Sequence, residues 1–262
     1  SVRIWRTATR APESFLVTMS GNPIEQVSFS DDGQLLGLLS SNRVHVMDTA
    51  NGDVVAQFEL GERHRSIAFA DATRLFVGSE NGALRVISKD AVGSWSIQSI
   101  WTGDTAIRWL KVSPRSQFLV FVDQNNLARQ FSLAEGRLGE ASLQLPAPVE
   151  EVVFAPGGSR VLFRTPRWIH RAGSSTNGLI WLDATLAPNT LHGGEIVFGD
   201  PLTNNDAALG NRVYVLTAGD RSATLMPVDL TNQSGPGLFG NKDELLNEWR
   251  QKLGEQSIYE SP

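Results

Sequence analysis

Histidine is the first residue type to test for metal binding or acid–base chemistry, and the sequence holds four: His45, His64, His170 and His192. They lie far apart in the chain, with no His-Glu-x-x-His motif and no adjacent pair that would place two imidazoles on one metal ion. His45 stands between two valines of an alternating segment, so its side chain points away from the apolar face of that strand. We expect all four to be surface or loop histidines rather than metal ligands.

Three other segments resemble chemical motifs without completing them. Residues 173–178 lack the spacing and the following helix of a serine-hydrolase nucleophile turn. No Lys-Ser/Thr pair follows Gly235-Pro-Gly237, as a phosphate-binding loop requires. Asp31 and Asp32 offer too few oxygens for calcium and favour a turn instead. Cysteine is absent, which excludes thiolate catalysis and disulfides. The sequence therefore predicts no catalytic residue, no metal ligand and no cofactor-binding residue.

Arginine and tryptophan concentrate in one stretch, residues 164–171. The cluster consists of Arg164, Arg167, Trp168 and Arg171. Strand alternation would place Arg167 and Arg171 on one side and Trp168 on the other. Exposed Arg and Trp are the residue types favoured at protein interfaces, so we predict a partner-binding role. The alternative is that Trp168 packs between neighbouring sheets while the arginines stay solvated.

These residues must be positioned by a repeated element, because a large apolar residue followed two positions later by Asp or Pro recurs along the chain. The apolar members, here called the repeat marks, are Phe29, Phe69, Val112, Phe154 and Phe198. They lie 40, 43, 42 and 44 residues apart. A period near 40 indicates one copied unit that buries its apolar faces against the next copy.

A second mark follows most repeat marks by 12 or 13 residues: Asn42, Asn81, Asn125 and Asn211. Each opens a short segment of alternating apolar and polar residues, which is typical of a half-buried strand. Asn and Gly tolerate positive φ in tight turns, so we expect a hairpin at each position. Each copy is predicted to form four antiparallel strands. Residues 202–208 are too polar for a good second strand in the fifth copy, and we expect a loop or a short edge there.

The two ends of the chain depart from the repeat. Residues 1–20 match only the third and fourth strands of a copy, so we predict the outer half of an incomplete unit, followed by five full units in 21–232. Residues 233–262 are predicted to form a linker and a C-terminal amphipathic helix. Its apolar face would carry Leu245, Trp249 and Leu253, which we predict to pack on the repeat array itself or on an adjoining domain, with a separate partner as the alternative.

Composition limits the partners. The chain has 262 residues and a formal net charge of -5, so it lacks the basic footprint of a nucleic-acid-binding protein. No apolar run approaches the roughly 20 residues that span a bilayer, so any membrane association would depend on segments outside this chain. Absent cysteine fits a bacterial periplasmic or extracytoplasmic domain without excluding others.

Units of this length with a Phe-Ser-Asp-Asp-Gly element at Phe29 resemble WD-repeat β-propellers, and Phe154 opens a similar element. The resemblance covers nearly residues 1–230. It implies an all-β propeller of four-stranded blades that acts as a non-catalytic scaffold for protein–protein interaction or sensing. The Gly-His and Trp-Asp dipeptides of that family are missing, so its hydrogen-bonding network cannot be assigned to residues of this chain.

Two alternative functions stay open. The chain also resembles the propeller-like extracytoplasmic insert of bacterial phosphate-type ABC transporter permeases, which would imply a regulatory or docking role in transport. A propeller can also bind a small ligand, or act as an enzyme, through its central channel. Convergent polar groups at the axis would favour that second alternative.

Overall fold

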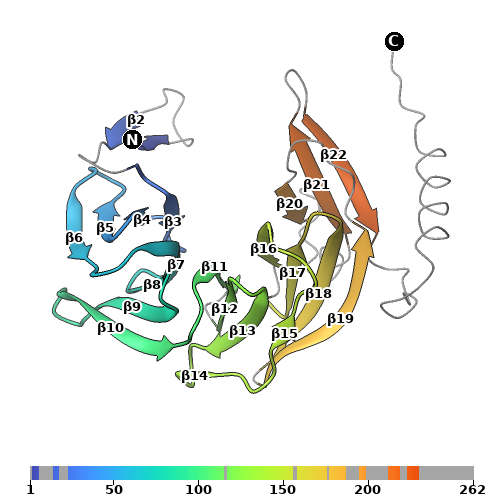
Figure 1. Cartoon of the computed structure of the whole chain (residues 1–262). Helices are drawn as coiled ribbons and strands as arrows, with labels where there is room; N and C mark the ends of the chain where they lie inside the picture. Colours follow the sequence, from blue (N-terminus) through green and yellow to red (C-terminus); the bar gives the residue numbers. More distant parts are fainter. Residues whose placement is uncertain are drawn as a thin grey trace, which may run out of the picture.

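Antiparallel sheets follow one another around an open arc (Figure 1). The computed structural model describes residues 2–5, 14–17, 23–114, 117–155, 158–175, 177–186, 195–198, 212–218 and 223–229. The regular elements of these residues are β-strands. A search of the same residues for a helix long and apolar enough to cross a bilayer finds none.

Four sheets have their strands in the same sequential order and are called blades A to D. Blade A contains β3 (Gln26–Phe29), β4 (Leu35–Ser40), β5 (Arg43–Asp48) and β6 (Val54–Glu59). Blade B contains β7 (His64–Asp71), β8 (Arg74–Ser79), β9 (Ala83–Lys89) and β10 (Trp95–Thr102). Blade C contains β11 (Ile107–Val112), β12 (Phe118–Asp123) and β13 (Leu127–Ser132), and its outer position is shared by β14 (Arg137–Leu138) and β15 (Leu143–Gln144). Blade D contains β16 (Glu151–Phe154), β17 (Arg160–Arg164), β18 (Trp168–Ser175) and β19 (Gly178–Leu186).

The first strand of every blade lies on the inner side of the arc and the last strand on the outer side (Figure 1). Within each blade, consecutive strands pair antiparallel, as Phe29 with Leu36 and Phe154 with Val161 illustrate. The predicted all-β architecture of four-stranded antiparallel sheets in a radial array is therefore confirmed.

The end sheets are smaller. β1 (Val2–Trp5) pairs only with β2 (Ser14–Val17) among the described strands. The fifth sheet contains β20 (Glu195–Phe198), β21 (Arg212–Ala218) and β22 (Ala223–Asp229) in that order. Among its described strands, β21 lies directly beside β20 and so takes the second position, as the loop or short edge expected at residues 202–208 would allow. The apolar alternation of β21 makes it a better partner for β20 than the polar residues 202–208, which lie outside the described residues.

The core consists of apolar clusters between consecutive blades rather than one central cluster. The principal contacts join Leu39, Val44 and Val46 to Ile67, Phe69 and Leu75 (A with B), Phe76 and Leu84 to Ile107 and Phe121 (B with C), and Val120 and Val122 to Val152 and Phe163 (C with D). Burying one such side chain contributes about 1.5–3 kcal/mol. Each blade thus depends on its neighbours for most of its buried surface.

Within the described residues, Asn42, Asn81 and Asn125 lie in hairpin turns as predicted, but positive φ falls on other residues. Ser41, Gly82 and Asn126 have φ values of 58°, 87° and 62°. Asn81 instead accepts a hydrogen bond from the backbone N–H of Ala83 through its side-chain oxygen, at 3.1 Å. The asparagines therefore stabilise these turns by their side chains or by their place next to the left-handed residue.

Glycine in a second strand lets the next blade approach closely. A Cβ atom built on Gly78 of β8 would lie 2.6 Å from Ile107 Cγ2 and from Ser66 Oγ. A Cβ on Gly173 of β18 would have its nearest neighbour at 3.8 Å, an ordinary contact. A methyl group at Gly78 would therefore clash with Ile107 of blade C, whereas one at Gly173 would make only ordinary contacts.

We expect Gly78→Ala to lower the free energy of unfolding by about 1–3 kcal/mol, because the added methyl group overpacks the B–C cluster. The matched variant Gly173→Ala should change it by no more than about 0.5 kcal/mol. Urea unfolding of both variants measures the difference. Equal losses would show that Gly78 does not mark a tight contact between blades.

Candidate binding site at the propeller axis

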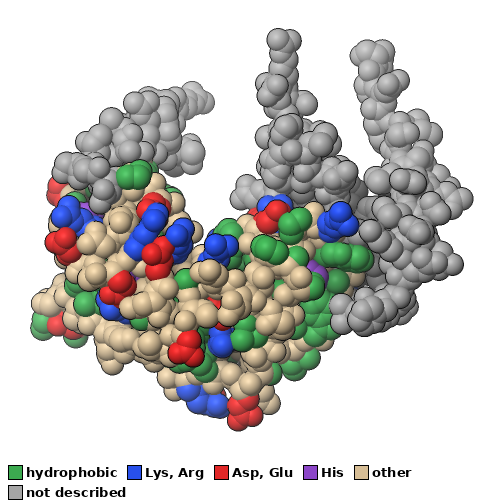
Figure 2. Space-filling model, in the orientation of Figure 1, with side chains coloured by type: hydrophobic (Ala, Val, Ile, Leu, Met, Phe, Trp, Pro, Cys, Tyr) green, Lys and Arg blue, Asp and Glu red, His purple; other side chains and the backbone are tan. Residues whose placement is uncertain are grey.

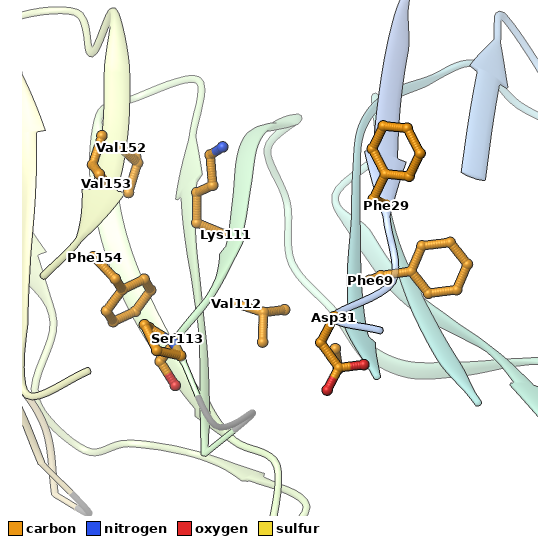
Figure 3. A pocket seen from close by; sticks show the side chains of 11 residues that line it. Phe29, Asp31, Phe69, Lys111, Val112, Ser113, Val152, Val153 and Phe154 are labelled. Carbon is orange, nitrogen blue, oxygen red and sulfur yellow. The ribbon is translucent and has the colours of Figure 1, made fainter. Parts of the chain in front are cut away.

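A cavity of about 350 Å³ opens where the first strands of blades A to D converge. Its lining consists of Phe29, Asp31, Phe69, Ala70, Lys111, Val112, Ser113, Pro114, Val152, Val153 and Phe154, and it is called the axial cup. Figure 3 shows Phe29 and Phe69 on one side of the cup, Phe154 on the opposite side, and Val112 between them. Four blades therefore contribute to one site.

The repeat marks of blades A to D all line this cup. From the sequence they were predicted to mark the repeating unit, and no binding role was predicted for them. The signal that could have placed them together is the period itself, because equivalent residues at the ends of inner strands must meet around the axis. The side chain of Phe198, the fifth repeat mark, lies outside the described residues.

Two charged side chains interrupt the apolar lining. Lys111 is exposed and reaches into the space between the two groups of apolar side chains (Figure 3), and it makes no ion pair within the described residues. Asp31 is exposed on the other side, where its carboxylate accepts a hydrogen bond from the Asp32 backbone N–H at 3.0 Å. Ser113 Oγ already accepts a hydrogen bond from the Phe118 backbone N–H at 2.9 Å. The cup can bind an apolar group with one anionic and one cationic contact.

Several charged groups of the opposite face are paired within the chain. Arg63 joins blade B to blade A through Glu25 at 2.9 Å, and Arg65 binds Glu80 at 2.6 Å. Figure 2 shows basic and acidic side chains next to one another over the part of the arc that contains blades A and B. A search of the described residues for groups of three or more His, Asp or Glu side chains that could hold a metal ion finds none.

The predicted Arg-Trp cluster lies at this opposite face, because the β17–β18 turn and the cup-lining end of β16 are at opposite ends of an antiparallel sheet. Arg164 is only 12% exposed and binds Glu150 at 2.7 Å and Glu151 at 3.1 Å. Arg171 is half-buried, and burial together with the nearby charge of Arg160 lowers its pKa. Arg164 and Arg171 thus already interact with other residues of this chain.

Arg167 and Trp168 are the more accessible members of the cluster. Arg167 is exposed and Trp168 is half-buried. The Trp168 carbonyl accepts a hydrogen bond from Thr165 Oγ1 at 3.1 Å, which fixes the turn. Leu245, Trp249 and Leu253 of the predicted helix lie outside the described residues.

The expectation of surface or loop histidines is wrong for His64 and His170, which are 0% and 1% exposed. His170 lies against Trp181, with ring centroids 5.3 Å apart, and its Nε2 is 3.2 Å from Thr165 Oγ1. Burial lowers the pKa of His170 to about 4, because the cationic form would lose its hydration. Alternation could not reveal this burial, since both faces of an inner blade strand are covered by neighbouring blades.

Comparisons with known proteins agree with this geometry at the level of fold. No protein-family model matches the sequence, and no curated protein matches it. Among solved structures, the chain is similar to the β-propeller domain of Cps50 (Swd1) from Myceliophteria thermophila, with a TM-score of 0.56 and 10% identity. The match covers 77% of this chain and 69% of that one. The fold is a β-propeller, and the resemblance to permease inserts gains no support from these comparisons.

His170 makes stability depend on pH. Its pKa is about 4 in the folded protein against 6.5 ordinarily, so the unfolded chain binds more protons between these values. The stabilisation is complete above pH 6.5 and is lost as the pH falls toward 4. From pH 7 to pH 5 this group should cost about 2 kcal/mol of unfolding free energy.

Urea unfolding at both pH values, compared between the wild type and His170→Gln, measures this effect. The variant should show a smaller loss on acidification. Some loss should remain, because burial also lowers the pKa of His45 and His64. An unchanged pH dependence in the variant would contradict the assignment.

Proposed function

We propose that this chain is a non-catalytic β-propeller scaffold that binds a protein partner or an adjoining domain. The observation that carries the proposal is the axial cup, whose apolar lining is supplied jointly by four blades and is bordered by Lys111 and Asp31. Such a site presents apolar area on a rigid support, so a partner's side chain can be desolvated there with little ordering cost.

The opposite charges of Lys111 and Asp31 would determine how a bound segment is oriented in the cup. A bound segment would place an acidic group near Lys111 and a basic or amide group near Asp31, with an apolar side chain between the repeat marks. A shallow site open to solvent suits a protruding side chain of a macromolecule. The cup also lies at a place where blades A to D all contribute contacts, as expected for a scaffold whose binding surface depends on the whole ring.

A second contact is proposed on the opposite face. Arg167 and Trp168 combine exposure with the residue types enriched at interfaces. The ion pairs of Arg164 support a structural role for that side chain, in holding the start of β16 to the end of β17. The predicted helix face with Leu245, Trp249 and Leu253 remains part of the proposal.

Charge reversal at the axial cup tests the function. The full-length protein, tagged and expressed in its native cells, would be purified with its partners as wild type, as Lys111→Glu with Asp31→Lys, and as Lys89→Glu. Lys89 is an exposed control on an outer part of blade B. We expect the wild type and the Lys89 control to retain the same partner, and the double variant to lose it by about tenfold or more.

Thermal unfolding serves as the control for integrity, because all three side chains are exposed and the variants should melt like the wild type. If the folded double variant recovers the same partners in the same amounts, the axial cup is not the binding surface. Recovery of no partner by the wild type would contradict the scaffold function itself.

A further inference from the structure

The sheet formed by β1 and β2 is half as wide as its neighbours. Ile4 of β1 is 8% exposed and packs with Leu36, Leu38 and Met47 of blade A. Third-strand residues make this kind of contact with the next blade elsewhere, as Val44 does with blade B. β1 therefore occupies the third position of a blade and β2 the fourth. The first and second positions are unfilled within the described residues.

Exposure identifies the surface left uncovered beside this sheet. Val27 and Phe29 of β3 are 47% and 52% exposed. The equivalent Ile67 and Phe69 of β7 are 5% and 7% exposed, and Val152 and Phe154 of β16 are 0% and 9% exposed. Among blades A to D, the same two positions are thus buried in blades B and D, buried at Leu110 and half-buried at Val112 in blade C, and open in blade A.

The second strand of the preceding blade normally covers these positions. A Cβ atom built on Gly37 of β4 would lie 3.1 Å from Ile67 Cδ1 and 3.2 Å from Phe69 Cε2. Gly78 of β8 meets Ile107 of β11 two positions further along the second strand, so a second strand also covers the first strand of blade C. The sheet that precedes blade A contains only β1 and β2 among the described residues. It therefore has no second strand to cover Val27 and Phe29.

Neighbouring first strands are also joined by polar contacts. The backbone N–H groups of Ile67 and Phe69 donate to Gln26 Oε1 at 3.1 Å and to Ser28 Oγ at 2.9 Å. The side chains of β3 that face blade B are therefore engaged, while those on the other face of β3 are exposed. The open surface is confined to one side of the first full blade.

We propose that this surface accepts a β-hairpin from a polypeptide segment outside residues 1–262. The second strand of the hairpin pairs antiparallel with the free edge of β1, and its side chains cover Val27 and Phe29. Its first strand lies at the axis. The hairpin must alternate apolar and polar residues and carry a small residue opposite Phe29, because Gly37 holds that place opposite Phe69, the equivalent repeat mark of blade B. This inference concerns completion of the ring and does not depend on the axial cup binding a partner.

A copy of the chain's own hairpin is a suitable probe. A fluorescent synthetic peptide of residues 24–40 carries the first two strands of blade A, including Gly37. Its binding to the full 262-residue protein is measured by fluorescence anisotropy. We expect saturable binding, and a loss of about tenfold or more both for Val27→Ser with Phe29→Ser and for a peptide with Gly37→Leu.

Two control variants test whether the peptide binds at this surface rather than elsewhere on the protein. Val54→Ser with Val55→Ser removes exposed valines of β6, 52% and 44% exposed, and should bind the peptide like the wild type. The Lys111→Glu variant should also bind it normally, even though it disturbs the axial cup. Hydrogen exchange should show new protection of the β1 amides when the peptide is bound.

Several results would overturn the proposal. They are the absence of saturable binding to the wild type, equal binding to the Val27 and Phe29 double variant, and equal binding of the Gly37→Leu peptide. A monomer–dimer equilibrium that the double variant abolishes would assign the surface to a second copy instead. Peptide binding that appears only after removal of residues 230–262 would assign it to that segment.

Discussion

The structure depends on the contact between the first strand of one blade and the second strand of the blade before it. A four-stranded sheet has two apolar faces and cannot bury either alone, so each blade is stable only between neighbours. Ile67 and Phe69 fill the space left by Gly37, and Ile107 fills that left by Gly78. The same contact sets the close approach of the inner strands, and that approach forms the axial cup from four blades.

The repeat could be predicted from the sequence because the spacing of the repeat marks is regular, even though the Gly-His and Trp-Asp dipeptides are missing. Equal intervals between Phe29, Phe69, Val112 and Phe154 predict both the blades and their radial order. In the fifth sheet β21 pairs with the edge of β20, and such pairing depends on which strand packs better rather than on period. The burial of His64 and His170 could not be predicted, since alternation distinguishes two faces of a strand but not which face is covered.

The candidate site was partly hidden for a related reason. The repeat marks predicted structure, and their convergence on one cup followed only from the ring geometry. Lys111 carried no sequence signal and Asp31 was predicted only as a turn residue, because single charges near turns are common on any surface. The Arg-Trp cluster was visible from composition, yet pairing of Arg164 with Glu150 and Glu151 depends on contacts between a loop and a strand end that no motif records.

The preceding blade buries the repeat mark of the blade that follows it, and this contact is what the fold depends on. The most direct measurement is the free energy of unfolding of Phe69→Ala beside that of Phe29→Ala. Phe69 has a complete preceding blade and should lose about 3–5 kcal/mol, whereas Phe29 lacks the covering strand and should lose less than about 1 kcal/mol. Equal losses in the two variants would contradict the claim.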